Sequence, residues 1–503
     1  VHQEIDAACW GDESHDFLPV SVSHGHYPPH IPQEKCGFLA DIPQEKCIFA
    51  SNIPQEKCCI FMKRIIYQQL KEWKSADDRK PLVLYGARQV GKTYILKEFG
   101  RNEYENLVYV NCQNNPTIAK LFETDKDVKR IMLGLAAYSN QTITAGKTLL
   151  FLDEIQEIPQ VIATLKYFCE DLPDIHIAVA GSLLGVMNMQ NVSFPVGKVN
   201  VMHLYPMTFS EFLWAMGKDK MVELLEGDET KLVESLSNEY IELLRQYYFV
   251  GGMPEAVLKF SMTRDVVSVR HIQKNILAAY QTDIAKHTGS TVQRIRMVWE
   301  SIPSQLSREN KKFIYGAVKK GARANDFELA IQWLVDAGLV YKVFRVTKPQ
   351  IPLKYYRDAN AFKLYLLDVG LLGAMADVPP DQILIGSRIF SEYKGSFSEN
   401  FVLQQIKPLD DMPIGYFSKD NSTMEVDFVL QVNNEILPVE VKAENNVKSK
   451  SLRNFITEDF AECHLTGYRF SMLDFMKQDW MENIPLYAVD AFIKKKRNES
   501  CRN

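Results

Sequence analysis

The sequence lacks an apolar run long enough to cross a bilayer, and its first residues do not form a signal peptide. These two absences predict a cytoplasmic protein without a membrane partner. An overall positive charge is also absent: 58 Lys and Arg stand against 63 Asp and Glu, a net charge of −5. This excludes nucleic-acid binding through global charge, but it does not exclude a local basic patch. We interpret the basic cluster at 494–497 as part of a solvated tail, residues 491–503.

Cysteine is scarce in most of the chain, because five of the nine cysteines lie in the first 61 residues. The other four are far apart, as is typical of thiols in a reducing compartment: Cys112, Cys169, Cys463 and Cys501. Within the first 61 residues, the hexapeptide Ile-Pro-Gln-Glu-Lys-Cys occurs at 31–36, 42–47 and 53–58, an 11-residue period. Its proline interrupts a helix, and no unit offers a face that could stack on the next. We therefore interpret residues 1–61 as a repeat-containing extension that is disordered or not native, in preference to a genuine N-terminal domain.

Residues 86–93, Gly-Ala-Arg-Gln-Val-Gly-Lys-Thr, fit the phosphate-binding pattern GxxxxGK(S/T). They follow an apolar segment at 81–85 that predicts a strand, and they precede a predicted helix at 94–99. In this context the loop N–H groups bind phosphate, Lys92 reaches the β- and γ-phosphates, and Thr93 binds Mg²⁺. The sequence therefore predicts that ATP and Mg²⁺ bind at seven residues of the loop: Gly86, Arg88, Gln89, Val90, Gly91, Lys92 and Thr93.

Three further apolar segments, at 107–111, 148–152 and 175–180, predict strands that are separated by helical stretches. Strands without polar alternation are typical of a parallel sheet that is covered by helices on both faces. We therefore predict an α/β fold, in which a P-loop ATPase domain with a parallel sheet occupies residues 62–205.

Polar residues follow two of these strands, at the ends where open α/β sheets bind their ligands. Asp153 and Glu154 end the strand at 148–152, about 60 residues after the phosphate loop. Asp153 is predicted to hold Mg²⁺ through water, and Glu154 to orient and deprotonate the attacking water. Ser182 follows the strand at 175–180 and is predicted to sense the γ-phosphate. We therefore expect these three residues to be catalytic.

The middle of the chain predicts two helical regions without an obvious catalytic constellation. We expect residues 206–290 to form a helical lid over the nucleotide and residues 291–361 to form a winged helix. The second helix of that unit, at 326–337, would enter a DNA groove, but it carries acidic residues and no Lys or Arg. Because phosphate contacts need positive charge, this pattern favours a structural or protein-docking role over DNA binding.

Residues 362–490 contain four polar residues in the order of the PD-(D/E)xK nuclease core. Glu399 lies at a predicted helix start and Asp427 on a strand, while Glu440 and Lys442 share one face of the returning strand. In that core the carboxylates hold Mg²⁺ and the lysine helps to activate water. We therefore predict a restriction-endonuclease-like α/β domain, with the three acids as metal ligands and the lysine as a catalytic residue. Two alternatives stay open: an exposed hairpin with an ion pair, and a related fold that binds without cutting.

Several motifs together resemble one prokaryotic family, the AAA-type P-loop ATPases that carry a C-terminal domain of unknown function. The resemblance runs from about residue 62 to about residue 489, and the motifs are GARQVGKT at 86–93, LDEIQ at 152–156, LYPM at 204–207, FSEF at 209–212, GGMPEA at 251–256, DVGLL at 368–372, EVDF at 425–428 and EVK at 440–442. It implies phosphate, metal and hydrolytic roles for four residues of this sequence: Lys92, Thr93, Asp153 and Glu154. The chain departs from the family at 197–198, where Gly-Lys replaces a frequent Gly-Arg, and lysine would be a poorer, monodentate phosphate ligand.

Two functions follow from these patterns. The first is a Mg²⁺-dependent ATPase that acts on DNA or RNA through a nuclease-like C-terminal domain. The second is an ATP-gated switch that binds a protein partner or drives assembly, with a non-cleaving C-terminal scaffold. Either function is compatible with a homo-oligomer. A basic rim around Asp427 and Glu440 would favour nucleic acid, and an acidic or apolar rim would favour a protein.

Overall fold

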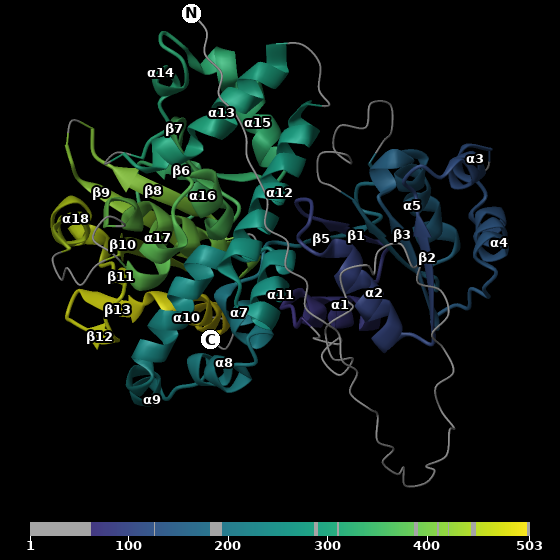
Figure 1. Ribbon diagram of the computed structural model, residues 1–503, viewed down its shortest axis with the longest axis horizontal. Coiled ribbons are helices and arrows are strands. Elements are labelled where there is room, and N and C mark those ends of the chain that lie inside the picture. The colour runs from purple at the N-terminus through teal and green to yellow at the C-terminus, as the bar shows by residue number, and fades with distance from the viewer. Residues whose placement is uncertain are drawn as a thin grey trace, which may run out of the picture. The chain divides into compact units, whose positions relative to one another are not determined.

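The computed structural model describes residues 62–124, 126–181, 194–285, 290–308, 311–386, 391–409, 412–420, 422–443 and 449–499. The predicted extension 1–61 and the predicted sensor Ser182 lie outside these residues. The elements below keep the labels of Figure 1.

A parallel sheet forms the first part of the described chain (Figure 1). Its strands lie in the order β2-β3-β4-β1-β5, and every neighbouring pair is parallel. They are β1 (Leu82–Tyr85), β2 (Asn106–Asn111), β3 (Thr148–Asp153), β4 (His176–Ala180) and β5 (Asn200–His203). Side chains alternate along each strand, so Leu84 packs into one hydrophobic cluster and Val83 into another. The predicted parallel sheet with two buried faces is therefore confirmed.

Helices cover both faces of this sheet: α1 (Ile66–Ser75), α2 (Lys92–Glu103), α3 (Pro116–Thr124), α4 (Val128–Ser139) and α5 (Gln160–Asp171). Leu70 of α1 and Phe99 of α2 belong to the cluster of Leu84. Ile131 of α4 and Leu165 of α5 belong to the cluster of Val83. Figure 1 shows α1 and α2 on one side of the strands and α3 and α4 on the other. The carboxyl ends of the strands are left clear for a ligand.

A helical region follows, with α7 (Phe209–Ala215), α8 (Asp219–Glu226), α9 (Thr230–Ser235), α10 (Ser237–Val250), α11 (Pro254–Thr263), α12 (Val266–Ala285), α13 (Ser290–Leu306), α14 (Tyr315–Val318) and α15 (Ala324–Asp336). Local sequence explains several boundaries. Thr208 and Glu211 form a reciprocal capping box at the start of α7, and Pro254 occupies the first position of α11. Within the described ranges, no helix is long and apolar enough to cross a membrane.

A mixed sheet forms the last part of the chain, in the order β12-β13-β11-β10-β9-β8-β6-β7. Its strands are β6 (Val340–Val346), β7 (Arg357–Leu366), β8 (Ile414–Ser418), β9 (Glu425–Val432), β10 (Glu435–Lys442), β11 (Gly467–Ser471), β12 (Met476–Lys477) and β13 (Met481–Pro485). The helices connected to it are α16 (Val369–Met375), α17 (Ser391–Ile406), α18 (Lys450–Asn454) and α19 (Val489–Glu499).

The predicted winged helix is not separated from this sheet. Its strand forms as β6, but β6 pairs with β7 on one side and with β8 on the other. The predicted boundary between residues 361 and 362 falls inside β7. The physical reason is that Val340 and Tyr341 are consecutive and both buried, so β6 has no solvent-exposed face of the kind a wing has.

The end of the described chain also differs from the prediction of a solvated tail at 491–503. Residues up to 499 belong to α19, and Ile493 is fully buried. Lys494 pairs with Glu226 at 2.5 Å, and Lys495 pairs with Asp228. The basic cluster therefore includes two lysines that pair with acids at the end of α8 and just after it, while the buried Ile493 anchors α19.

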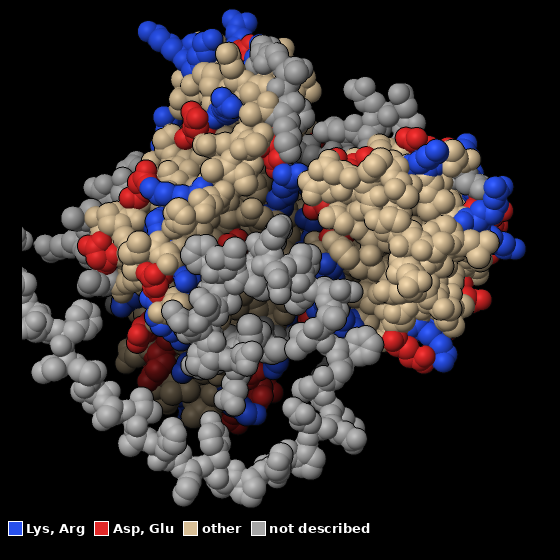
Figure 2. Space-filling model, turned by 45° about the vertical axis from the view of Figure 1, so that its right-hand side comes forward, with Lys and Arg blue, Asp and Glu red and all other residues tan. Residues whose placement is uncertain are grey.

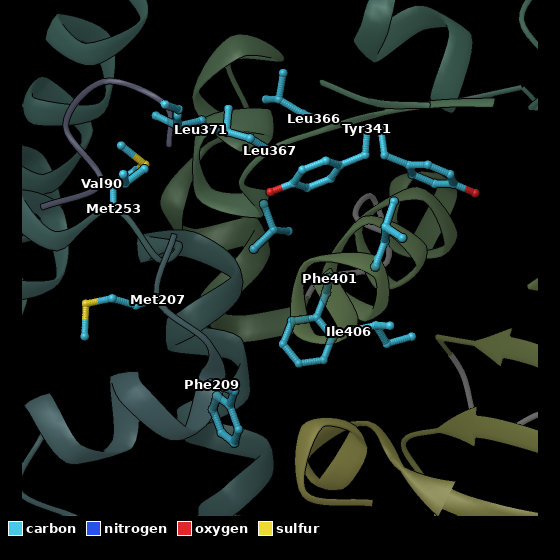
Figure 3. Packing of buried hydrophobic residues seen from close by; sticks show 14 of the residues in the cluster. Val90, Met207, Phe209, Met253, Tyr341, Leu366, Leu367, Leu371, Phe401 and Ile406 are labelled. Atoms are coloured by element: carbon cyan, nitrogen blue, oxygen red, sulfur yellow. The ribbon is translucent and has the colours of Figure 1, made fainter. Parts of the chain in front are cut away.

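One hydrophobic cluster continues from the phosphate loop into the C-terminal sheet. It includes Val90 of the loop, Met253 before α11, Leu371 of α16 and Phe401 of α17 (Figure 3). Because protein interiors are close-packed, a displacement at one of these residues is felt by its neighbours.

Candidate functional site

The phosphate loop turns sharply between β1 and α2. Gly86 and Gly91 have φ angles of 153° and 96°, in the region that favours glycine. A Cβ atom on Gly86 would lie 2.2 Å from the carbonyl oxygen of Leu204, so no larger residue fits there. The strand, loop and helix therefore have the arrangement that the sequence motif requires.

Lys92 begins α2, and its side chain folds back over the loop. Its Nζ donates to the carbonyl oxygens of Gly86, at 2.9 Å, and Ala87, at 2.8 Å. Burial lowers the pKa of Lys92 to about 8, against the opposing influence of Glu154 and Asp153. A partly desolvated ammonium group at this position is suited to an anionic ligand, because phosphate oxygens would favour its charged form.

Thr93 and Asp153 come together from α2 and the end of β3. The Thr93 hydroxyl donates to Oδ2 of Asp153 at 2.8 Å, and the Tyr109 hydroxyl donates to the same oxygen at 3.3 Å. Burial raises the pKa of Asp153, and the hydrogen bond from Thr93 opposes this shift. A hydroxyl and a carboxylate oxygen side by side form the donor set that P-loop proteins offer to Mg²⁺.

Glu154 follows β3 in a left-handed backbone conformation, with φ at 53°. A residue other than glycine rarely adopts such an angle, so this conformation points to a constrained position. The Gln156 side chain donates to the Glu154 carboxylate, and the Glu154 N–H donates to Oδ1 of Asp153 at 3.0 Å. The predicted acidic pair is therefore held at the end of the strand, beside the phosphate loop.

These groups line a cavity of about 510 Å³. One wall comes from the phosphate loop and the start of α2, and Glu154 forms part of another. Pro254 and Glu255, at the start of α11, also line the cavity. The sequence predicted that the helical region 206–290 covers the nucleotide, but it singled out neither Pro254 nor Glu255 as part of the site.

A buried arginine supports the loop from behind. Arg64 donates to the carbonyl oxygens of Val90, at 3.0 Å, and Tyr205, at 2.6 Å, and its Nε pairs with Glu211 at 3.0 Å. Arg64 is 6% exposed, so these partners compensate a charge that is almost fully removed from water. Arg64 was assigned no role from the sequence, since its partners lie 26 to 147 residues away.

A second polar cluster lies in the C-terminal sheet, centred on Glu399 of α17. Glu399 is 3% exposed, accepts a hydrogen bond from the Tyr365 hydroxyl at 2.9 Å and pairs with Lys311. Lys363, which is fully buried, lies 3.7 Å from Glu399 and also pairs with Glu425. Burial would raise the pKa of Glu399, but the two lysines outweigh burial and lower it.

The other predicted residues lie on β9 and β10. Asp427 accepts a hydrogen bond from the N–H of Val441 at 2.8 Å, and Lys442 pairs with Glu440 at 2.8 Å. Burial and the proximity of Glu399 raise the pKa of Asp427. Glu440 is 4% exposed, and its Oε2 has no hydrogen-bond partner among the described residues. The four predicted residues therefore belong to one polar region of the sheet.

The predicted convergence of Glu399, Asp427 and Glu440 on one cation stays a prediction. In the part of the chain that the structure describes, no three His, Cys, Asp or Glu side chains are arranged so that they could hold a metal ion. Lys311 and Lys363 instead pair with Glu399. Neither lysine was predicted, because they lie 88 and 36 residues before Glu399 in the sequence.

Comparisons with known protein families divide the chain into three matched segments. The pattern of an AAA domain matches residues 78–213. A domain of unknown function, DUF8612, matches residues 241–382, and another, DUF4143, matches residues 394–486. No curated protein matches the chain.

Solved structures that are similar to the chain have low identity. The Walker-type ATPase PABY2304 of Pyrococcus abyssi is 13% identical, with a TM-score of 0.41, over 63% of this chain and 96% of that one. The Aeropyrum pernix Orc1 protein in complex with DNA is 14% identical, with a TM-score of 0.27, over 62% and 91%. The RuvB Holliday junction branch migration motor of Thermotoga maritima is 15% identical, with a TM-score of 0.27, over 56% and 89%.

The matched AAA segment coincides with the parallel sheet and its phosphate loop, and the DUF4143 segment covers most of the mixed sheet. The chain therefore contains a P-loop ATPase domain of the AAA type, followed by two domains of unknown function, DUF8612 and DUF4143.

Proposed function

We propose that the protein binds ATP with Mg²⁺ and hydrolyses it in the cavity between the phosphate loop and the start of α11. The observation that carries this proposal is the hydrogen bond between Thr93 and Asp153, 2.8 Å long, which joins the helix after the loop to the end of β3, the strand on the far side of β4 from β1. Lys92 lies in the same cavity. The cation Lys92, the metal-ligand pair Thr93 and Asp153, and the acid Glu154 thus lie together where a triphosphate would bind.

Each residue has a distinct role in this proposal. Lys92 and the N–H groups of the loop bind the β- and γ-phosphates, and Thr93 and Asp153 hold Mg²⁺, which would neutralise charge on the phosphates. Glu154 orients a water molecule and accepts its proton. Arg64 is a positioning residue, because it contacts the loop carbonyl of Val90 and does not line the cavity. Ser182 retains its predicted role as a sensor of the γ-phosphate.

Replacing Lys92 with alanine tests the proposal. The change removes the ammonium group that would neutralise the phosphates, so ATP affinity should fall by about 100-fold or more. Lys147→Ala is a suitable control, because Lys147 pairs with Glu105 at 3.1 Å next to the amino end of β3, opposite to the site. Calorimetric titration with ATP and Mg²⁺ measures the ATP affinity of each variant. Equal affinities for the wild type and Lys92→Ala would contradict the assignment.

For the C-terminal domain, we propose a non-cleaving scaffold that responds to ATP, in preference to a working nuclease. The contacts of Glu399 with Lys311 and Lys363 favour this candidate, because a carboxylate already neutralised by two ammonium groups is a weak metal ligand. Nuclease-like chemistry remains the second candidate, and the unpartnered Oε2 of Glu440 beside Lys442 supports it.

The partner of such a scaffold would be nucleic acid or protein. Exposed basic residues are the surface feature that would favour nucleic acid. Lys319, Lys320 and Arg323 are exposed around α14, and Figure 2 shows Lys and Arg side chains gathered at the upper end of the molecule. Leu329 of α15 is 78% exposed, but a single exposed apolar residue is normal on a protein surface and does not indicate a protein partner.

Incubation with plasmid DNA or single-stranded RNA, in Mg²⁺ or Mn²⁺, distinguishes the candidates. We expect no more cleavage by the full chain than by its Asp427→Asn variant. Metal-dependent cleavage that Asp427→Asn loses would establish the nuclease instead. The ATPase rate in the same reactions identifies the partner, since stimulation by DNA or RNA, weakening as salt rises, would indicate nucleic acid.

A further inference from the structure

Arg88 of the phosphate loop is paired with an acid of the helical region. Its Nη1 lies 2.7 Å from Oδ1 of Asp283, near the C-terminal end of α12. Arg88 also lines the cavity that holds Lys92 and Glu154. The guanidinium group is therefore placed between two possible anionic partners, the Asp283 carboxylate and a phosphate in the cavity.

The same helix also holds the backbone of Arg88. The Tyr280 hydroxyl donates to the Arg88 carbonyl oxygen at 2.9 Å. Residues three apart lie on the same face of a helix, so Tyr280 and Asp283 contact the loop together. Tyr280 is 1% exposed and makes an edge-on contact with Trp299 of α13, with 6.2 Å between ring centroids. A change at Arg88 can therefore reach α12 and α13 through packed groups.

The two partners of Arg88 would differ in strength. The Asp283 pair is partly open to solvent, with side-chain exposures of 37% for Arg88 and 20% for Asp283. Pairs of this kind contribute little, because water screens both charges. A triphosphate carries several negative charges, and the planar guanidinium can bind phosphate through two parallel hydrogen bonds. The Arg88 guanidinium should therefore bind phosphate in preference to the Asp283 carboxylate.

We propose that Asp283 is an intramolecular competitor of the nucleotide. Without nucleotide it holds Arg88, and when ATP binds, Arg88 turns to the phosphates and the contact of Asp283 with the loop is lost, while Tyr280 still holds the loop backbone. This inference rests on the proposed ATP binding and deepens it, because it adds a regulatory residue from the helical region to the site. In this proposal, the contacts of α12 differ between the empty cavity and the cavity with bound ATP.

A double-mutant cycle tests the competition. Asp283→Asn removes the carboxylate charge, so ATP should bind about two- to fivefold more tightly, the size expected when a partly exposed ion pair no longer has to be broken. Arg88→Ala should weaken binding. In the Arg88→Ala background, Asp283→Asn should change affinity by less than about twofold, because the pair between Arg88 and Asp283 is already absent. Asp283→Glu, which restores the charge, should return the affinity to that of the wild type.

Asp459→Asn is a matched control, since Asp459 is 22% exposed and pairs with Lys419 at the same 2.7 Å, but in the C-terminal sheet. It should leave ATP affinity unchanged. Hydrogen exchange of residues 266–285 gives a second readout: ATP should increase exchange at the end of α12 in the wild type, and Asp283→Asn should show the increase without ATP.

The outcomes separate this inference from the proposed function. If the wild type does not bind ATP, the proposed function fails. If the wild type binds ATP but Asp283→Asn binds ATP no more tightly than the wild type, the proposed competition is wrong and ATP binding stands. The same conclusion follows if Asp283→Asn increases ATP affinity by the same factor in the wild type and in the Arg88→Ala background.

Discussion

Replacing Glu154 with glutamine should slow ATP hydrolysis by about two to four orders of magnitude, the contribution expected of a general base. Binding of ATP should stay within about threefold of the wild type, because Lys92, Thr93 and Asp153 remain in place. The variant should therefore hold ATP in its unhydrolysed form. Single-turnover measurement of phosphate release, together with a binding titration, separates the two effects.

The control for this variant is Glu157→Gln. Glu157 is an exposed acid three residues later, on the turn that follows Glu154, and it does not line the cavity. Its replacement should leave the rate unchanged. If Glu154→Gln hydrolysed ATP as fast as Glu157→Gln, another residue would have to activate the water, and Glu255, which also lines the cavity, would be the next candidate.

The parts of the nucleotide site that could be predicted are those that local sequence specifies. A buried strand, a glycine-rich turn and a helix follow each other within 86–93 and its flanks, and each has its own residue pattern. Asp153 and Glu154 could be placed because parallel strands bring their carboxyl ends to one edge of the sheet. The strand order and the register of β3 beside β4 were not predicted, because strands that are apolar on both faces carry no signal for either.

The residues that were missed depend on long-range contacts. Arg64 supports the phosphate loop through Val90, and its paired acid Glu211 is 147 residues away. Glu255 reaches the cavity only because the turn before α11 is fixed elsewhere: the N–H of Gly252 donates to Asp368 at 2.5 Å. Neither contact leaves a periodic or spaced signal in the sequence.

Domain limits were the least predictable part of the fold. The pattern at 339–343 correctly indicates a strand, but it cannot tell whether the strand forms a wing or joins a neighbouring sheet. The basic run at 494–497 has the composition of a solvated segment, yet Ile493 just before it is buried and anchors α19. In both places tertiary packing, which one sequence does not reveal, decides the outcome.

Replacing Lys363 with methionine should destabilise the protein strongly, by about 3–5 kcal/mol at neutral pH, because it removes one of the two cations beside the buried Glu399 and the cation paired with Glu425. Lys363 is fully buried and contacts Glu399 and Glu425. Burial would lower the pKa of Lys363, but the nearby carboxylates outweigh burial and raise it, so the lysine is charged at every pH where the protein is handled. Methionine has a similar length, so the loss should come from charge and not from a cavity.

The pH dependence distinguishes this explanation from a packing defect. Without Lys363, the pKa of Glu399 should rise, and that of Asp427, already raised by burial and by Glu399, should rise further. When a carboxyl group has a higher pKa in the folded state than in the unfolded state, the folded protein loses stability as pH rises through the folded-state pKa and regains it as pH falls. The deficit of Lys363→Met should therefore be largest near pH 8.5 and smaller near pH 5.5, as measured by urea unfolding midpoints. Lys477→Met, which breaks a solvent-exposed pair with Glu482 in the same sheet, should leave stability almost unchanged at any pH. A deficit of Lys363→Met that did not change with pH would mean that packing, and not charge, makes this lysine necessary.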